Sequence, residues 1–392
     1  MRLSGTNLER AGDHNQRVTL HAIRVNGPIT RAELAQITGL TAPAIANITK
    51  RLLGDKLIQE AGQRRGGRGQ PATKLVINPD SWFSIGLNVD RDHVTMVVLD
   101  FEGRIRARAS SEMNFAMPKD VEKFFRKSVG ELLEKVGIGR ERLVGIGVAL
   151  PDDMPRAATL PHQPEDYGVW ASTNVSSLLC DVLELPLFVE NDAAAATMGE
   201  MQFGLGKKYQ TFFYLLITAA LGGSLVIEGN HFRGATGRSG ELGLLRGRDA
   251  SGYERQIQNI VSLSALYSRL AEQGIRVHAP PELMRLDERG TAVLDAWVEA
   301  AVDTLIDPVV AVNCLVNPEA ILIGGRLPAP IVDRIASRLN QRLASLGGTV
   351  PSIAPVARAA LSDDAPAVGA AILPFSHRLL PTRTALMKVA AG

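Results

Sequence analysis

The chain contains little cysteine and no long apolar segment. Its 392 residues include only Cys180 and Cys314, which excludes a disulfide framework and a cysteine-rich zinc site. The longest apolar stretch, residues 212–227, is interrupted by small polar residues and is too short to span a membrane. The first 17 residues lack the apolar core of a signal peptide. With 45% hydrophobic and 21% charged residues, we expect a soluble cytoplasmic protein of two or three domains with no membrane partner.

Charge is distributed unevenly along the chain. Residues 1–77 carry 12 Lys and Arg against 5 Asp and Glu, whereas the remainder carries 31 against 36. Such an asymmetry suggests that the first segment binds a polyanion and that the second has another role. A solvated basic face is the alternative, and charge alone does not separate the two.

Two helices are predicted within this basic segment, after a first helix over residues 18–24. Thr30, with Glu33 three residues later, has the signature of a capping box. Thr41 can cap the next helix, with Pro43 tolerated in its first turn. Apolar residues recur at helical spacing across the intervening turn, so the two helices should share one core. This layout predicts a helix-turn-helix, whose second helix enters the major groove.

Two short strands, residues 57–61 and 74–77, are predicted on either side of a glycine-rich loop with three arginines. Such a loop suits a wing that lies along phosphates or reaches into a minor groove. A flexible surface loop is the alternative, but the preceding helices favour a winged helix. The side chains expected to contact operator DNA are Thr41, Pro43, Asn47, Lys50 and Arg51 on the second helix and Arg64, Arg65 and Arg68 in the wing.

Strands and helices alternate in the rest of the chain. Three consecutive strands are predicted over residues 84–109, followed by a helix over about 118–136, a strand over 143–150, a second helix over 175–183 and a short strand over 187–189. The order restarts with a helix over 193–204 and with strands over 211–217 and 225–228, which a turn at 219–224 connects. Two halves with the same order suggest duplicated α/β lobes around a cleft.

Three sequence runs, residues 189–193, 232–243 and 317–325, carry a resemblance to a known family. In these runs, and over almost its whole length, the chain resembles the ROK family (repressors, open reading frames and sugar kinases). The resemblance implies a bilobal α/β fold of the actin and hexokinase type, which is ribonuclease H-like, behind an N-terminal winged helix-turn-helix. The expected boundaries are 1–77 for the winged helix, 78–190 plus 363–392 for the first lobe, and 191–362 for the second lobe, with the sugar-site motifs and an oligomerisation surface.

Two glycine-rich turns hold the phosphates of ATP in kinases of this family, and both are altered here. Where the family has Asp-x-Gly-Gly-Thr-Lys, residues 88–93 read Asn-Val-Asp-Arg-Asp-His. In the second turn, residues 218–224, three glycine positions carry larger side chains. Phosphate binding needs close backbone approach and no adjacent carboxylates. We therefore expect no ATP and no kinase activity, which leaves Asp192, at the position of the family's catalytic base, as a hydrogen-bond acceptor.

The zinc motif that is common in the family is also missing. Leu244 stands at the histidine position of Gly-Glu-x-Gly-His, and the loop that follows, residues 246–254, contains no cysteine. Leucine cannot ligate a metal, and His231 has no partner at ligand spacing. We expect neither zinc nor any other cofactor.

The resemblance implies a sugar site made of the hydrogen-bond acceptors that remain. These residues are Asn191, Asp192, Glu241 and Glu254. Helix capping is the alternative role for the first two, and a solvated surface position for the two glutamates. Asp152 follows Pro151 where the family usually has glycine, so the cavity wall differs and the identity of the sugar is open.

These features together predict a sugar-responsive transcriptional regulator, a repressor of carbohydrate uptake or catabolism genes. The winged helix would bind operator DNA, and a catalytically inactive kinase-like body would sense a sugar or sugar derivative. Since winged-helix repressors generally read paired half-sites, we expect a homodimer or homotetramer. The alternatives are a DNA-binding ROK sugar kinase that kept its activity and a regulator controlled by a protein partner.

Overall fold

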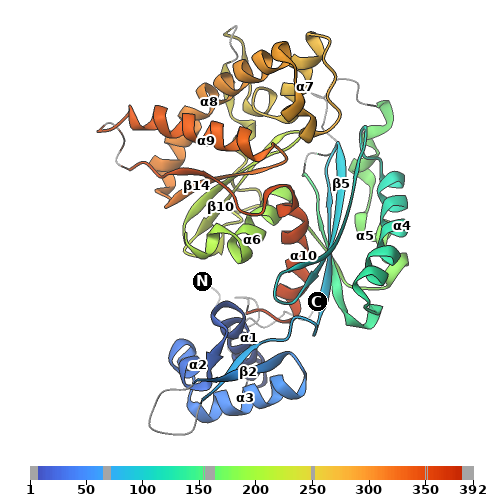
Figure 1. The fold of residues 1–392 in the computed structure, drawn as a ribbon, viewed down its shortest axis with the longest axis vertical. Helices are drawn as coiled ribbons and strands as arrows, with labels where there is room; N and C mark the ends of the chain where they lie inside the picture. Colours follow the sequence, from blue (N-terminus) through green and yellow to red (C-terminus); the bar gives the residue numbers. More distant parts are fainter. Residues whose placement is uncertain are drawn as a thin grey trace.

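The protein consists of a small N-terminal unit and two α/β lobes, which stand above it in Figure 1. The computed structural model describes residues 8–64, 72–152, 154, 164–248, 252–348, 350 and 352–381. Within these residues no helix is both long enough and apolar enough to cross a membrane. The two lobes each contain a five-stranded mixed sheet, as the predicted duplicated α/β architecture requires.

The N-terminal unit is a winged helix. Thr30 caps α2 with both hydrogen bonds of a capping box, and the side chain of Thr41 caps α3, as predicted. α1 is longer than the helix predicted over residues 18–24. The prediction missed its first turns because they are polar and show no apolar periodicity. A three-stranded sheet in the order β1-β3-β2 completes the unit. Its elements are α1 (Leu8–Asn26), β1 (Ile29–Thr30), α2 (Arg31–Thr38), α3 (Ala42–Gly54), β2 (Ile58–Arg64) and β3 (Ala72–Ile77).

The first lobe is built on a sheet in the order β6-β5-β4-β7-β8. β4, β5 and β6 are antiparallel neighbours, whereas β7 runs parallel to β4 and to β8. All residues of β4, β5 and β7 are buried, as expected for strands that are covered on both faces. The elements are β4 (Phe83–Val89), β5 (His93–Asp100), β6 (Ile105–Glu112), α4 (Pro118–Val136), β7 (Leu143–Ala149), α5 (Val175–Leu183) and β8 (Leu187–Glu190).

The second lobe is built on a sheet in the order β11-β10-β9-β14-β15. The turn predicted at residues 219–224 is wrong in its length. Leu221 already pairs with Ile217, so the turn covers only residues 218–220 and the next two glycines belong to a strand. The elements are α6 (Asp192–Phe203), β9 (Phe212–Ile217), β10 (Leu221–Ile227), β11 (Asn230–His231), β12 (Arg246–Arg248), β13 (Glu254–Gln256), α7 (Leu263–Glu272), α8 (Glu288–Val316), β14 (Ala320–Gly325), α9 (Ala329–Ala344) and β15 (Val356–Arg358).

Two helices meet where the lobes join. α10 (Ala365–Arg378) packs on β4 and β7 of the first lobe and on α6 of the second (Figure 1). The helices approach so closely at Gly369 that a Cβ there would collide with the carbonyl oxygen of Ala195. Close-packed interiors tolerate no such addition without a backbone shift. The position of α6 is therefore fixed against the first lobe through α10.

The winged helix docks on the ends of the same two helices. Arg17 of α1 donates to the carbonyl oxygen of His377, at 3.0 Å. Arg24 donates to the side chain of Gln202, and its guanidinium lies 5.3 Å from the centre of the Phe203 ring at the end of α6. The apolar cores of the winged helix and of α10 form one continuous cluster. The winged helix is thus attached to α6 and α10 by polar and apolar contacts.

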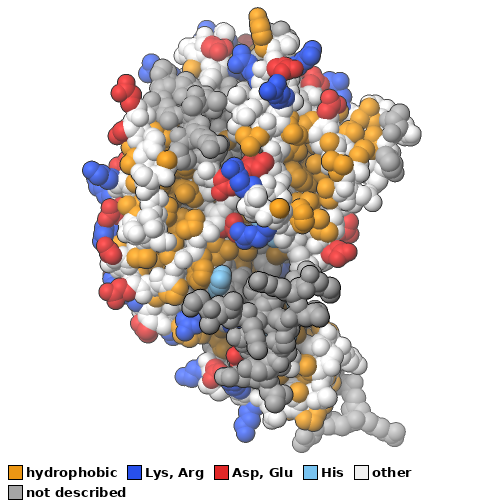
Figure 2. Space-filling view, turned by 180° about the vertical axis from the view of Figure 1, so that it is seen from behind, with side chains coloured by type: hydrophobic (Ala, Val, Ile, Leu, Met, Phe, Trp, Pro, Cys, Tyr) orange, Lys and Arg blue, Asp and Glu red, His pale blue; other side chains and the backbone are white. Residues whose placement is uncertain are grey.

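The surface of the two lobes shows no continuous basic area on the face seen in Figure 2. Acidic and basic side chains alternate there with patches of hydrophobic side chains. This distribution agrees with the acidic excess of the chain after residue 77, where 31 basic residues stand against 36 acidic ones. A field that attracts a polyanion is not expected from this part of the molecule.

Candidate functional site

A small cavity lies between the lobes, beside the first turn of α6. Its volume is about 40 Å³. The first lobe contributes the turn between β4 and β5 and the residues that follow β7. The second lobe contributes the start of α6, the turn between β9 and β10 and the loop after β11. We call it the ligand cavity. Its polar lining residues include Asn191, Asp192 and Glu241, three of the four predicted sugar-site residues, together with Arg91, Asp152, Thr218, His231, Arg238, Ser239 and Gln258.

Asn191 and Asp192 are held in place by the start of α6. The Asn191 Oδ1 atom accepts a hydrogen bond from the backbone N–H of Ala194 at 3.1 Å, which makes this residue the N-cap. Asp192 is 8% exposed, and its Oδ1 atom accepts from the N–H of Ala193 at 2.8 Å. A carboxylate is stabilised at this end of a helix by the macrodipole. Capping and lining of the cavity therefore coexist in both residues.

Glu241 belongs to a loop that passes close to β10. Gly240 has a φ of +90°, and a Cβ there would collide with the backbone of Gly223. Only glycine lets the loop run this way, so it determines where Glu241 points. The Oε1 atom of Glu241 accepts from Nη2 of Arg238 at 2.9 Å, and Nε of Arg238 lies 3.4 Å from Oδ2 of Asp152.

Glu254 lies outside the ligand cavity. It begins β13, its side chain is 57% exposed, and it forms an ion pair with Arg246 at 3.2 Å across the β12–β13 ribbon. It lines a separate groove between this ribbon and α8. The structure does not bring Glu254 together with the other three predicted residues, because the segment that carries it folds back into a ribbon.

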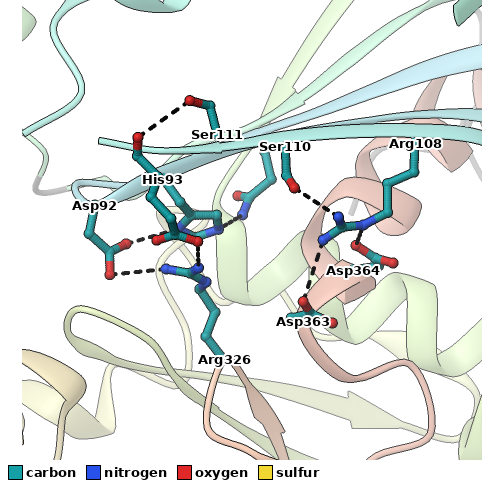
Figure 3. Close-up of polar contacts among 10 residues, drawn as sticks. Asp92, His93, Arg108, Ser110, Ser111, Arg326, Asp363 and Asp364 are labelled. Atoms are coloured by element: carbon teal, nitrogen blue, oxygen red, sulfur yellow. Dashed lines mark hydrogen bonds and ion pairs between the residues drawn. The ribbon is translucent and has the colours of Figure 1, made fainter. Parts of the chain in front are cut away.

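On the other side of the β4–β5 turn, an arginine of the second lobe contacts two carboxylates of the first (Figure 3). Arg326 directly follows β14. Its Nη1 atom lies 3.1 Å from Oδ2 of Asp92, and its Nη2 atom donates to Glu112 at the end of β6. His93 binds the other oxygen of Asp92 at 2.8 Å. Side chains of opposite charge thus fill the region next to the first altered turn.

The charges in this cluster stabilise each other. Burial alone would raise the pKa of Asp92, but the hydrogen bond and charge of His93 and the charge of Arg326 outweigh it, and the pKa lies below its ordinary value. Burial alone would lower the pKa of Arg326, but the charges of Asp92 and Glu112 outweigh it and raise the pKa. Both groups are therefore ionised at neutral pH.

A second arginine in Figure 3 ties the first sheet to the segment before α10. Nε of Arg108 in β6 lies 2.6 Å from Oδ1 of Asp364, and its Nη2 atom lies 3.4 Å from Oδ2 of Asp363. Nη1 of the same side chain donates to the Ser110 hydroxyl at 2.8 Å. The edge of the first sheet and the start of α10 are therefore held together by ion pairs beside the Arg326 cluster.

In the described part of the chain, one group of side chains has ligand atoms close enough to share a cation. It consists of Asp90, Asp92 and His93, whose ligand atoms lie within 4.8 Å of one another. A cation there would have to displace the guanidinium of Arg326 from Asp92. At the family's zinc position, Leu244 is 40% exposed and offers no ligand atom. The residues at that position do not fit a structural zinc site.

The outer face of α3 carries the residues predicted to read DNA. Ile45, Thr49 and Leu52 are buried against the rest of the winged helix, which turns the opposite face outward. Arg64 is the last residue of β2, and Arg65 and Arg68 lie outside the described residues. The exposed predicted residues on the helix are Thr41, Pro43, Asn47, Lys50 and Arg51.

Arg91, Arg238 and Arg326 are candidate functional residues that the sequence reasoning did not single out. Arg91 is 3% exposed and lines the ligand cavity from the first lobe. Each of the three lies in or directly beside a motif of the resemblance. A tight turn around a ligand favours small residues such as glycine, alanine or threonine, so an arginine at these positions was the available signal. The partners of Arg326 could not be found in this way, because Asp92 and Arg326 are 234 positions apart.

The sequence model of the ROK family matches residues 84–376 of this chain. The chain belongs to the ROK family. The predicted family and fold class are thereby confirmed, and a solved ROK family transcriptional regulator, described as a homologue of the Escherichia coli Mlc protein, has the same fold. It superposes with a TM-score of 0.65 at 20% identity, over 93% of this chain and 96% of its own.

Other ROK proteins of both functional kinds are similar to this chain. The xylose repressor of Bacillus spizizenii is 27% identical over 229 residues, which is 58% of this chain and 59% of the repressor. The chain therefore spans little more than half of that relative in the alignment. A ROK glucokinase from Streptomyces griseus, solved with glucose and AMPPNP, has a TM-score of 0.58 at 21% identity over 74% of this chain and 98% of its own. Likeness at this level establishes the fold and leaves repressor or kinase activity to the site.

Proposed function

We propose that this ROK protein is a sugar-responsive DNA-binding repressor of carbohydrate uptake or catabolism genes, with a kinase-like body that no longer uses ATP. The observation that carries the proposal is the placement of α6. Its first turn supplies Asn191 and Asp192 to the ligand cavity, and its last residues contact Arg24 of the winged helix. A ligand that shifts the start of α6 therefore acts on a rigid element that reaches the DNA-binding unit.

Linkage gives the physical mechanism. A sugar that binds one arrangement of the lobes more tightly shifts the population toward it, by no more than its difference in affinity for the two. In a homodimer or homotetramer, such a shift changes the spacing of the winged helices and lowers affinity for paired half-sites. A regulator of this kind works in the cytoplasm, on operator DNA.

The former phosphate site supports the loss of kinase activity. Asp92 and Arg326 occupy the region beside the first altered turn, and the second turn is shortened to residues 218–220 by the pairing of Leu221 with Ile217. Phosphoryl transfer depends on backbone N–H groups and cations placed around the transferred phosphate. Carboxylates beside the first turn repel a phosphate, and Arg326 is already paired with two of them, so Asp192 would have a sugar hydroxyl beside it but no phosphate donor.

The test compares Asp192→Asn, Glu241→Gln and Glu254→Gln with the parent protein. Calorimetry with D-xylose, D-glucose and N-acetyl-D-glucosamine measures ligand affinity, and a duplex selected with the parent protein from a random library measures DNA affinity. Hydrogen bonds to a charged acceptor contribute about 1.5–3 kcal/mol, so each cavity variant should lose about ten- to a hundredfold in sugar affinity. Glu254→Gln is the matched control, because its carboxylate lies outside the cavity.

DNA affinity without sugar should be the same in all four proteins, since α3 is separate from the cavity. Release of DNA by the sugar should need higher concentrations in the Asp192 and Glu241 variants. ATP-dependent phosphorylation of a sugar that disappears in Asp192→Asn would contradict the proposal in favour of an active kinase.

A further inference from the structure

The ligand cavity is too small for a sugar as it stands, and a side chain that lines it is paired with two of the other lining residues. Its volume of about 40 Å³ is well below the roughly 300 Å³ at which ligand sites begin. Arg238 lines the cavity, and its guanidinium lies between two other lining residues. Nη2 is 2.9 Å from Oε1 of Glu241, and Nε is 3.4 Å from Oδ2 of Asp152.

We propose that Arg238 is a tethered occupant of the ligand cavity, which a neutral sugar has to displace from Asp152 and Glu241 in order to bind. The inference rests on the proposed function of the cavity as a sugar site, and it adds the residue that controls entry. A guanidinium offers planar N–H donors to two carboxylates, and the hydroxyl groups of a sugar offer O–H donors to the same acceptors. The side chain and the sugar therefore compete for one set of partners.

The neighbouring Arg233 shows what a firmly held arginine looks like in the same loop. It is itself 58% exposed, but it pairs at 2.7 Å with Glu190, whose side chain is only 7% exposed. Asp152 and Glu241, the carboxylate partners of Arg238, are in contrast 35% and 33% exposed, and Arg238 is 43% exposed. Ion pairs between solvent-accessible side chains are weak, because water and salt screen them. These two ion pairs of Arg238 therefore cost little to break.

Displacement of Arg238 also removes a contact between the lobes. Asp152 follows β7 of the first lobe, whereas Arg238 and Glu241 belong to the second. When the guanidinium swings out, Glu241 turns to the sugar and the ion pair between Asp152 and Arg238, which joins the two lobes, is broken. The lobes then lose one of their ionic contacts at the wall of the cavity, beside α6. Sugar entry and a change in lobe position are coupled in this way.

The experiment measures sugar affinity in the full-length parent protein, in Arg238→Ala and in Arg246→Ala. The control Arg246 is also an exposed arginine of the second lobe paired with a glutamate, but it lies outside the cavity. Calorimetry uses D-xylose, D-glucose and N-acetyl-D-glucosamine. We expect Arg238→Ala to bind the recognised sugar about three- to tenfold more tightly than the parent, and Arg246→Ala to bind it like the parent. Arg238→Lys keeps the charge but loses the planar guanidinium, so its sugar affinity should lie between those of the parent and of Arg238→Ala.

Salt gives a second reading that a merely structural role would not move. Because the sugar is neutral, raising NaCl from 50 to 500 mM should weaken only the competing ion pairs, so sugar affinity of the parent rises while that of Arg238→Ala stays constant. Weaker or equal binding by Arg238→Ala would overturn the inference and make Arg238 a direct sugar contact or a bystander. If neither protein binds any of the three sugars, the proposed function fails, and this inference with it.

Discussion

Two arginines of the second lobe each pair with two carboxylates, at least one of which belongs to the first lobe, and they differ mainly in burial. Arg326 is 8% exposed and contacts Asp92 and Glu112, whereas Arg238 is 43% exposed and contacts Asp152 and Glu241. The geometry of the contacts is similar, but their strength is not, because solvent screens the exposed side chain far more. The comparison teaches that an ionic contact can hold two lobes permanently at one place and yield to a ligand at another.

The same difference in burial distinguishes two parts of the ligand site that the resemblance implies. Next to the β4–β5 turn, Arg326 and its partners occupy part of the space that the resemblance gives to phosphates, and Arg326 and Glu112 also line an open groove of about 660 Å³. At the start of α6, Arg238 lines one cavity together with Asn191, which caps the helix, and with Glu241, whose direction is set by the loop at Gly240. Under the proposed function, the different burial of the two guanidinium groups corresponds to the loss of one ligand and the retention of another.

The largest effect is expected from Arg326→Ala. Removal of the guanidinium leaves Asp92 and Glu112 without their shared counter-charge next to Asp90, and the free energy of unfolding should fall by about 2–3 kcal/mol. This is less than for a wholly buried pair, because Glu112 is 43% exposed. Urea denaturation at pH 7 measures it.

Arg334→Ala is the matched control for this variant. Arg334 pairs at 2.6 Å with Asp295 on the surface of the same lobe, where both side chains are more than one-third exposed. The control should change the free energy of unfolding by less than about 1 kcal/mol. Equal losses of unfolding free energy in Arg326→Ala and Arg334→Ala would mean that burial does not strengthen the Arg326 contact, which would contradict the comparison.

A third arginine sharpens the comparison, because it faces a histidine instead of a carboxylate. Arg24 lies 3.5 Å from Nδ1 of His21 where the winged helix meets α6. Burial, and next the charge of Arg24, lower the pKa of His21 to about 4. The unfolded chain binds a proton near pH 6.5, so the stability that comes from neutral His21 is complete above that pH and is lost as the pH falls toward 4.

We therefore expect the parent protein to lose about 1 kcal/mol of stability between pH 7 and pH 5 that His21→Gln does not lose. Thermal unfolding of both proteins across this range measures the difference. His278→Gln is the control, because His278 lies in a loop of the second lobe, away from Arg24. A parallel pH dependence in the parent and His21→Gln would show that His21 is not held neutral at the domain junction.

Local signals predicted much of this fold. The capping box at Thr30 and Glu33, and the helices over 118–136 and 175–183, occur where the sequence placed them, because caps and apolar periodicity are contained in a few neighbouring residues. The start of β10 was missed. It depends on the pairing of Leu221 with Ile217, whereas the glycines at 222 and 223 favour the prediction of a turn.

The sequence predicted only those site residues that lie within short motifs. Asn191, Asp192 and Glu241 were found through motifs, and they meet at one cavity. Glu254 was assigned only through the resemblance, and the β12–β13 ribbon that carries it turns it away from the cavity. The partners of Arg326 are separated from it by most of the chain, so no pattern along the sequence could have paired them.

The smallest effect is expected for the stability of Arg238→Ala. Its ion pairs are half-exposed, and Asp152 and Glu241 regain water when the guanidinium is removed, so the free energy of unfolding should change by no more than about 0.5 kcal/mol. Urea denaturation beside Arg326→Ala makes the contrast direct. A loss of 2 kcal/mol or more, roughly that of Arg326→Ala, would make Arg238 a structural tie of the same kind. The side chain would then be too costly to displace, and sugar entry would have to open the cavity by some other movement. A near-zero change, in contrast, leaves the guanidinium free to exchange with sugar hydroxyls, which is what a displaceable side chain at a ligand site requires.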